Sequence, residues 1–458
     1  TRSIRCIYGG SMRYILILLI SIFISSLDSA IVPQTARLSN GLKVIVFQNP
    51  LLPSVYTLTK YDVGTADDPL NMVGLSHMLE HMMFKGSSKY PVGAIDNILN
   101  SCGGISNAHT NYDSTWYIFA LPAAQLDIAL DIEADRMEKL NITDEEFRPE
   151  QKVVMEERQM RLGNYPFRTS AEICQRAIYT AHPYGIFPIG YESHIKAYTV
   201  DALRAHYEKW YAPNNATIVV IGPYDLAYVL PKIEDKFGSI RPKELSERIR
   251  IPEPDHDGLT TTLEQENSRA ENIYVSISYR VPTLITKPEA YLAMSMLVGT
   301  LNGSDRVLYQ KMVKEKRLAL GVSSGYAYGK DDMDFTFTLI LAPSMNVENA
   351  EKFLFEQLAE FLKKGLAEKD FYNAKQEQLN AFAFAMDGEA FLVSMANSVL
   401  DGFPLEAVSK YENILKATTI EQAHEMLKLI LVKPPIAISR NYPKGKMPKR
   451  HYHKVLVQ

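Results

Sequence analysis

The sequence predicts two related α/β domains in which sheets and helices form α+β layers. Its 458 residues exceed the about 250–300 residues at which a single hydrophobic core stops growing, so more than one domain is expected. Predicted strands alternate with predicted helices along the chain, which is typical of layered α/β folds. A faint internal repeat indicates that the second domain is a copy of the first.

The elements follow from local patterns. Residues 42–47 and 55–63 are predicted strands, because an apolar run follows an Asn-Gly turn and an alternating stretch comes next. Residues 74–84 (GLSHMLEHMMF) lack Gly, Pro and β-branched residues after the first position, and therefore predict a helix. We also predict helices at 121–139 and 145–161, which are charged and periodic, and a buried strand at 216–221.

The predicted boundary between the domains is residues 241–258, which are charged and contain three prolines. This linker separates a first domain at 31–240 from a second at 259–458. Shifting the first half by 217 residues places the helix at 74–84 on residues 291–301. The polar residues His77, Glu80 and His81 then fall on the apolar Met294, Leu297 and Val298. One copy therefore keeps a polar constellation that the other has replaced.

The N-terminal segment indicates export. Met12 and Arg13 precede the apolar run ILILLISIFI, which gives way to small residues before position 30. This order is typical of a secretory signal peptide, so residues 1–30 are predicted to be a leader; a retained membrane anchor is the alternative. Removal of the leader leaves Cys102 and Cys174, which either pair or remain two separate thiols.

Composition excludes one class of function. The net charge is −4, with 22% charged residues, whereas a nucleic-acid-binding protein usually carries a strongly basic face. We therefore expect no nucleic-acid partner, and contact with a membrane only if the leader stays uncleaved.

The segment His77-Met78-Leu79-Glu80-His81 carries the predicted chemistry. Positions i and i+4 lie about 40° apart around a helix, so the two imidazoles can reach one metal ion. Glu80 lies on the same side, within reach of a metal-bound water. The order H-x-x-E-H is a zinc peptidase motif, and neutral imidazoles suit zinc. An exposed polar face is the alternative, but the neighbouring residues are apolar, which favours a buried helix whose polar groups need a partner.

Spacing along the chain does not by itself identify the third metal ligand. The predicted helix at 145–161 offers Glu150, Glu156 and Glu157, and an acidic helix is often just solvated. Glu150 and Glu157 share one face, two turns apart, while Glu156 is rotated away.

Several segments, in order, resemble the pitrilysin/insulinase family of zinc peptidases. In the first half these segments are NGLKVIV (40–46), GLSHMLEHMMFKG (74–86), NAHTNYDST (107–115), EADRMEKL (133–140), EQKVVMEERQMR (150–161), HPYGIFPIG (182–190) and WYAPNNATIVVIG (210–222). In the second half the match is looser, at residues 275–282 and 308–323. The resemblance implies a clamshell of two homologous domains, each with a mixed sheet packed by helices, of which 31–240 bears the zinc and 259–458 is inactive.

The resemblance also implies roles for individual residues. It makes Glu157 the third ligand of one Zn²⁺ per chain, beside His77 and His81, and gives Glu150 the task of orienting a ligand histidine. Asn107 and Ala108 match the edge-strand positions that pair with the backbone of the substrate.

The sequence departs from the family pattern at one place. Relatives that are catalytically self-sufficient carry an Arg and a Tyr seven residues apart in the second half. Lys314 and Gly321 stand at the matching positions here, and Arg317 and Tyr326 are nearby but out of register. Some bacterial relatives divide the work between two chains, so we expect a related partner chain that supplies the Arg/Tyr pair.

The sequence therefore predicts a zinc-dependent endopeptidase of peptides or unfolded segments, with Glu80 as general base. A non-catalytic assembly subunit of the same family is the rival, and the complete His77/Glu80/His81/Glu157 set argues against it. A periplasmic or exported location is expected; a mitochondrial one is disfavoured, because transit peptides are Arg-rich and amphipathic.

Overall fold

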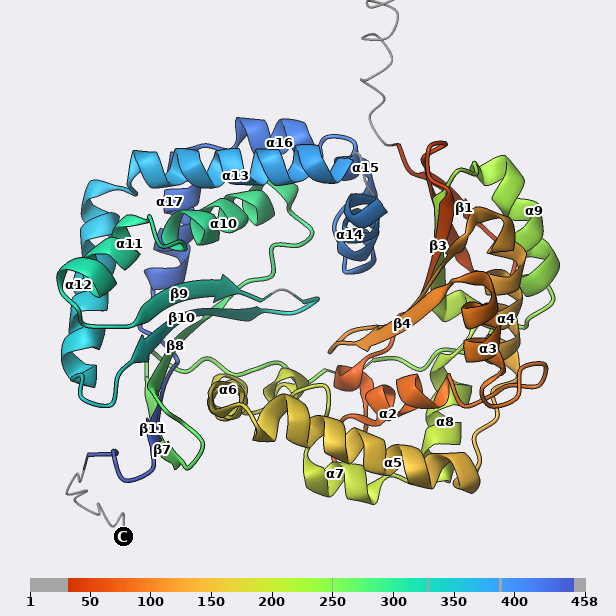
Figure 1. The fold of residues 1–458 in the computed structure, drawn as a ribbon, viewed down its shortest axis with the longest axis horizontal. Coiled ribbons are helices and arrows are strands. Elements are labelled where there is room, and N and C mark those ends of the chain that lie inside the picture. The colour runs from red at the N-terminus through yellow and green to blue at the C-terminus, as the bar shows by residue number, and fades with distance from the viewer. Residues whose placement is uncertain (1–31, 249, 328, 387–388, 449–458) are drawn as a thin grey trace, which may run out of the picture.

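The fold is seen in a computed structural model that describes residues 32–248, 250–327, 329–386 and 389–448. The predicted leader at 1–30 lies outside these residues. Two mixed β-sheets stand opposite each other, each with helices on its outer side, so the predicted clamshell of two α/β halves is confirmed (Figure 1). Within the described ranges, no helix combines the length and apolar character needed to cross a membrane.

The first sheet has six strands in the order β1-β2-β6-β3-β5-β4, with β2 and β6 parallel and the other neighbours antiparallel. Its strands are β1 (Gln34–Arg37), β2 (Lys43–Gln48), β3 (Ser54–Tyr61), β4 (Ile105–Thr110), β5 (Thr115–Pro122) and β6 (Ala216–Gly222). The α-helices of this half are α2 (Leu75–Met82), α3 (Ala94–Cys102), α4 (Leu126–Glu138), α5 (Asp144–Arg158), α6 (Pro166–Ile178), α7 (Glu192–Ala197), α8 (Val200–Trp210) and α9 (Leu226–Phe237). Shorter turns are η1 (Thr65–Asp67), η2 (Ala123–Gln125), the π-helix η3 (Gln159–Gly163), η4 (Pro183–Gly185) and η5 (Pro213–Asn215).

The second sheet repeats this topology with five strands in the order β7-β11-β8-β10-β9. Its strands are β7 (Thr261–Asn267), β8 (Ile273–Val281), β9 (Gly321–Tyr326), β10 (Met333–Leu341) and β11 (Ala437–Pro443). The helices are α10 (Pro288–Leu301), α11 (Val307–Tyr309), the π-helix η6 (Gln310–Glu315), α12 (Val347–Lys364), α13 (Glu368–Met386), α14 (Glu389–Leu400), α15 (Leu405–Val408), α16 (Tyr411–Ala417) and α17 (Ile420–Leu431). The parallel pair β7-β11 corresponds to β2-β6, so the order matches β2-β6-β3-β5-β4 strand for strand.

Two helices cross between the halves. Helix α6 of the first half packs on β8 and β11 of the second sheet, where Ser170 Oγ lies 2.8 Å from Ser439 Oγ. In return, α14 of the second half lies against the first sheet, with Leu392 and Met395 in one apolar cluster with Phe47. This exchange of helices was not predicted from the sequence. Each sheet therefore needs the other half to cover its inner face.

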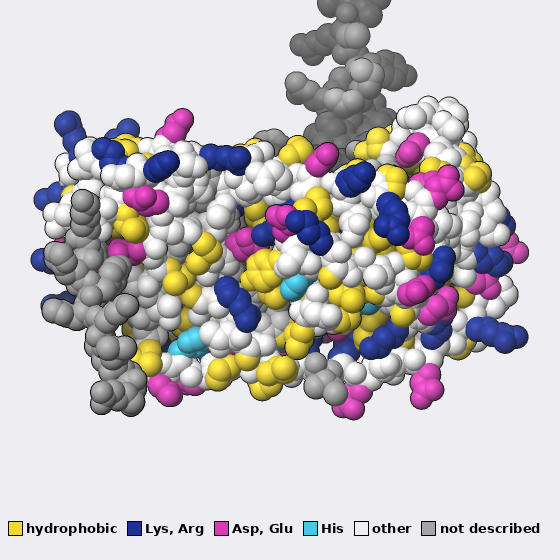
Figure 2. All heavy atoms as spheres, turned by 90° about the horizontal axis from the view of Figure 1, so that it is seen from below, with side chains coloured by type: hydrophobic (Ala, Val, Ile, Leu, Met, Phe, Trp, Pro, Cys, Tyr) yellow, Lys and Arg dark blue, Asp and Glu magenta, His cyan; other side chains and the backbone are white. Residues whose placement is uncertain are grey.

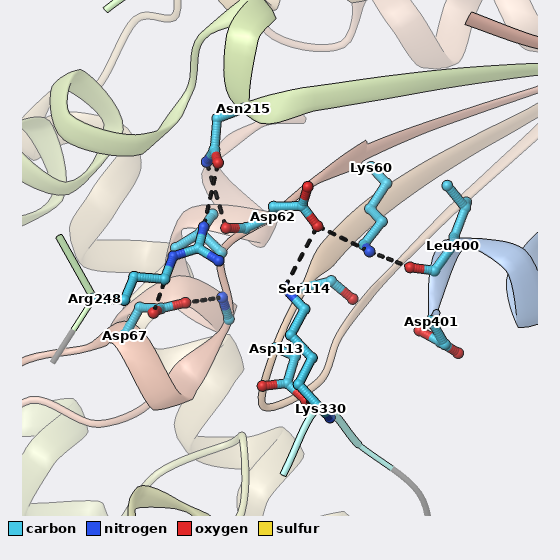
Figure 3. Close-up of polar contacts among 12 residues, drawn as sticks. Lys60, Asp62, Asp67, Asp113, Ser114, Asn215, Arg248, Lys330, Leu400 and Asp401 are labelled. Atoms are coloured by element: carbon cyan, nitrogen blue, oxygen red, sulfur yellow. Dashed lines mark hydrogen bonds and ion pairs between the residues drawn. The ribbon is translucent and has the colours of Figure 1, made fainter. Parts of the chain in front are cut away.

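Buried polar contacts also join the halves (Figure 3). Lys60 of β3 is buried, pairs with Asp62 at 3.0 Å, and donates a hydrogen bond to the backbone carbonyl of Leu400 at the end of α14. Lys330, from the hairpin between β9 and β10, lies 3.6 Å from the same Asp62 carboxylate. The first sheet is thus tied to two separate elements of the second half.

The segment predicted as a linker is anchored rather than free. Its Arg248 lies 3.5 Å from Asp67 of η1. Arg250 lies 2.6 Å from Asp113, in the β4-β5 hairpin, and 2.5 Å from Asp331, in the β9-β10 hairpin. Residues 241–258 therefore bridge corresponding hairpins of both halves.

Two predicted helices differ in their bounds. The helix expected from residue 121 begins at Leu126, because residues 115–122 pair with β3 as strand β5, in which Val55 stands opposite Leu121. The helix expected at 145–161 is α-helical to Arg158 and continues as the π-helix η3. Cys102 and Cys174 are both free thiols.

Candidate metal centre

Helix α2, which carries the H-x-x-E-H residues, is fixed at its N-terminus by Asp68. The Asp68 carboxylate accepts hydrogen bonds from the backbone N–H of Gly74 (2.8 Å) and Ser76 (3.1 Å), and from the Ser76 hydroxyl (2.6 Å). These bonds satisfy donors that the first turn of a helix leaves free. Gly74 has φ 101°, and a Cβ there would lie 2.3 Å from Tyr198 Oη, so the position requires glycine.

The structure brings His77, His81 and Glu157 together. Both histidines lie on α2, and Glu157 lies near the end of α5, which packs across α2. Glu157 Oε2 is 3.2 Å from His81 Nε2 and 3.6 Å from His77 Nε2. One donor atom from each residue lies within 4.8 Å of the other two.

This donor set fits a zinc ion. Tetrahedral zinc with ligand bonds of about 2.0–2.1 Å separates its ligand atoms by about 3.3 Å, close to the two measured distances to Glu157. Glu157 Oε2 is buried and accepts no hydrogen bond among the described residues, although it faces both imidazoles. Burial lowers the pKa of His77 to about 3, so this imidazole is neutral, as a metal ligand must be.

Glu150 orients His81. Glu150 Oε1 lies 2.8 Å from His81 Nδ1 and accepts its proton in a hydrogen bond, which leaves Nε2 directed at Glu157. Lys85 lies 2.6 Å from the other carboxylate oxygen of Glu150. Burial opposes the charged form of His81, but the hydrogen bond to Glu150 and the nearby carboxylate of Glu157 outweigh it and raise its pKa to about 9. A cation bound between these residues would replace that proton.

Glu80 occupies a separate position beside the donors. Its Oε2 accepts a hydrogen bond of 2.5 Å from the Thr110 hydroxyl at the end of β4. Burial raises the pKa of Glu80 from 4.5 to about 7, although the Thr110 bond and the nearby His81 lower it. A carboxyl group with this pKa can both take and give a proton near neutral pH.

Strand β4, which carries Asn107 and Ala108, is the free edge of the first sheet. Asn107 is exposed, and its side-chain oxygen accepts a hydrogen bond of 2.9 Å from the Ala108 N–H. A cavity of about 290 Å³ lies at the end of this strand, where His77, Thr110, Arg161 and Phe187 are among its lining residues. An extended chain paired with β4 would therefore run toward the three donors.

The four second-half residues at or near the positions of the Arg/Tyr pair lie in different settings. Lys314, on the π-helix η6, is exposed and has its Nζ 5.8 Å from the Tyr309 ring. Gly321 begins β9, and the exposed Arg317 precedes it with φ 53°. Tyr326 ends β9, and its hydroxyl accepts a hydrogen bond of 3.1 Å from the Leu284 N–H.

Three supporting residues of the site were not predicted from the sequence. Thr110 holds Glu80, Lys85 contacts Glu150, and Arg161 lies 2.7 Å from Glu157 Oε1. Arg161 is four residues beyond Glu157, so helical spacing could have indicated it, whereas Lys85 lies beyond the end of α2 and contacts Glu150 on another helix. Thr110 comes from a strand, and no local pattern connects it to α2.

The fold and site define a class of protein with two duplicated α/β halves and a His/His/Glu metal-binding geometry in the first half. Residues 43–181 match the family model described as insulinase, peptidase family M16, and residues 197–378 match the model described as the peptidase M16 inactive domain. The chain belongs to the insulinase family, peptidase family M16.

Relatives and solved structures agree with this membership. The zinc protease PqqE of Helicobacter pylori is 32% identical over 338 residues, which cover 72% of this chain and 75% of PqqE. The crystal structure of a protease from Helicobacter pylori superposes with a TM-score of 0.81 at 25% identity, covering 90% of this chain and 99% of that one. The periplasmic protease PqqL from Escherichia coli shares the fold, with a TM-score of 0.73 at 20% identity over 89% of this chain and 47% of PqqL.

Proposed function

We propose that this chain is a zinc-dependent endopeptidase that binds one zinc ion through His77, His81 and Glu157. The observation that carries the proposal is the meeting of three donor atoms at one place. The Nε2 atoms of both histidines lie close to a buried Glu157 oxygen that accepts no hydrogen bond among the described residues. The neutral state of His77 and the naming of relatives as zinc proteases support it.

The residues around the donors have separate tasks in this proposal. Zinc bound here would polarise the scissile carbonyl and lower the pKa of a water toward about 7. Glu80 takes the proton of the attacking water and passes it to the leaving amine, for which a pKa of about 7 is well matched. Thr110 keeps the Glu80 carboxylate aimed at the site through its hydrogen bond.

The substrate in this proposal is an extended peptide or an unfolded segment. Such a chain adds as a strand to β4, where main-chain hydrogen bonds at Asn107 and Ala108 supply affinity without demanding one sequence. A folded protein without a free segment does not offer a strand to this edge.

We also propose that a related chain completes the enzyme and that the pair acts in the periplasm. Lys314 and Arg317 are both exposed, which supports the proposal that this chain does not itself supply the Arg/Tyr pair. The outer side of α5 to α6 exposes apolar side chains among charged ones, which suits a contact surface (Figure 2). The exposed apolar residues of this segment include Val153, Met160, Tyr165 and Ile173. The periplasmic location named for PqqL and the predicted leader support the location.

Two measurements test the proposal. Zinc content of the His77→Ala and Glu157→Gln variants should fall well below the one equivalent expected for the native chain, and undiminished zinc in both would reject the ligand set. Glu80→Gln should keep zinc and fold but lose about 10²–10⁴-fold in peptide hydrolysis, since an amide cannot accept the proton. Glu156→Gln, an exposed carboxylate on α5, is the matched control. Activity of Glu80→Gln within a few-fold of wild type would exclude Glu80 as general base.

A further inference from the structure

The inner face of the second sheet is unusually polar. Strand β10 alternates between Phe335, Phe337 and Leu339, which are buried in the core, and Asp334, Thr336 and Thr338 on the opposite face. The facing residues of β8 on that side are Ser276 and Ser278. The first sheet differs, because apolar residues of its inner face pack against α14.

This polar face borders a cavity between the halves. Helix α6 covers only part of the face, where Cys174 Sγ lies 3.5 Å from Ser278 Oγ. A cavity of about 480 Å³ remains, within the range of small-molecule sites. Its lining joins Tyr112 and Phe167 of the first half to hydroxyl-bearing residues of the second. Those hydroxyl residues are Ser276, Ser278, Ser323, Ser324, Thr336 and Thr338.

Asp334 is the acidic residue that lines this cavity. Its carboxylate accepts a hydrogen bond of 3.0 Å from the Thr336 hydroxyl. Within the described part of the chain, no Lys, Arg or His lies at ion-pair distance from it. Arg280 is its cross-strand neighbour, but the Arg280 guanidinium donates to the backbone carbonyl of Pro254 at 3.0 Å. Burial raises the pKa of Asp334, which an incoming cation would reverse.

The cavity adjoins the candidate metal centre. Ala171 and Phe187 line both this cavity and the one that contains His77. The cavity at His77 carries the cationic Arg161 and Arg168, so the two spaces have opposite charge character. A basic side chain entering beside the metal centre is repelled by the arginines and attracted to Asp334.

We propose that the cavity beneath α6 binds a lysine or arginine side chain of the peptide substrate, with the Asp334 carboxylate pairing its charge. The inference rests on the proposed peptidase function. The hydroxyl oxygens around the carboxylate accept hydrogen bonds from the remaining N–H groups of an ammonium or guanidinium group. Since the two cavities share lining residues, the basic residue lies a few positions from the cleaved bond.

The test uses the zinc-loaded full chain, together with its partner if one co-purifies, and a set of fluorogenic peptides. The peptides differ at one position, scanned over three residues on each side of the cleaved bond, where Lys, norleucine or Glu is placed. At one position, kcat/KM for Lys should exceed that for norleucine, which is uncharged and of similar shape, by about tenfold or more. Asp334→Asn should reduce this ratio to within about twofold while leaving cleavage of the norleucine peptide unchanged.

Two further variants sharpen the result. Asp334→Lys should reverse the preference from Lys to Glu at the same position. Asp332→Asn removes the same charge from an exposed neighbour and should leave the preference intact. A Lys preference that survives in Asp334→Asn, or no preference in the wild type, would overturn the assignment while the peptidase function stands.

Failure of the proposed function is recognised separately. If the wild-type chain cleaves none of the peptides, their affinities are measured by fluorescence anisotropy. Tighter binding of the Lys peptide that is lost in Asp334→Asn supports the cavity as a basic-residue site, and equal binding of the Lys and norleucine peptides refutes it.

Discussion

Replacing Glu150 by Gln tests how the structure prepares His81 for a metal. Glu150 Oε1 accepts the His81 Nδ1 proton at 2.8 Å, and this bond fixes the tautomer that directs the Nε2 lone pair at the site. Glu150 is buried and its second oxygen contacts Lys85 at 2.6 Å, so the carboxylate is held at both ends. A glutamine keeps the shape but removes the charge and one acceptor.

The expected effect is a weaker zinc site with an unchanged fold. Loss of such a supporting carboxylate typically reduces metal affinity about 10–100-fold, or about 1.4–2.8 kcal/mol. The Gln oxygen can still accept from His81, and a charge-assisted bond is about twice as strong as a neutral one. Glu150→Gln should therefore fall near the tenfold end, and Glu150→Ala near the hundredfold end.

Chelator competition at pH 7.5 measures the zinc dissociation constant of each variant. Glu156→Gln is the control, because Glu156 is exposed on the same helix and rotated away from α2. A dissociation constant for Glu150→Gln within twofold of wild type would refute the orienting role. An equal loss in Glu156→Gln would show a general effect of charge instead.

Three further predictions concern stability, assembly and metal removal. Burial raises the pKa of Asp401 from 3.8 to about 6, so ionising it destabilises the folded state above pH 6 and has no effect below pH 3.8. Asp401→Asn should therefore stabilise the chain by about 1–3 kcal/mol in denaturant unfolding at pH 7.5 and by little at pH 4; an equal gain at both values contradicts this. The chain should be weakly active alone in peptide assays and should gain activity when light scattering shows it in a heterodimer. Full activity of the lone chain that is abolished by Arg317→Ala or Tyr326→Phe would refute the need for a partner. Chelation of zinc should speed amide hydrogen exchange in α2 and α5 and leave α10 unchanged, and equal changes in all three helices would argue against a structural role of the ion in the first half.

The fold was largely predictable because two kinds of local pattern carry it. Alternation and apolar runs located β2, β3 and β6 of the first half, and the replacement of His77 by Met294 in a shifted copy indicated the duplication that the matching strand orders display. The crossing of α6 and α14 was not predictable. An amphipathic helix shows that it needs a partner, but its sequence does not say which sheet supplies one.

The candidate site was predictable to the extent that it is local. His77, Glu80 and His81 lie on one helix, so spacing alone placed them on one face. The choice among three glutamates depended on family resemblance, because their position relative to α2 is a matter of tertiary packing. Thr110 and Asp334 escaped notice for the same reason. A single threonine or aspartate in an alternating strand is ordinary, and what it faces becomes visible when the halves are assembled.

The two copies divide stability and chemistry between them. Helix α10 buries Met294 and Leu297 where α2 buries His77 and Glu80, so the second copy gains apolar burial that the first has given up. Polar groups on α2 are tolerated because each has an assigned partner: Thr110 for Glu80, Glu150 for His81, and in our proposal a zinc ion for the pair of imidazoles. The second copy is polar elsewhere, on the sheet face that borders the shared cavity. In our two proposals, the second half therefore binds no metal at the position of α10, and its polar sheet face selects the substrate that the first half cleaves.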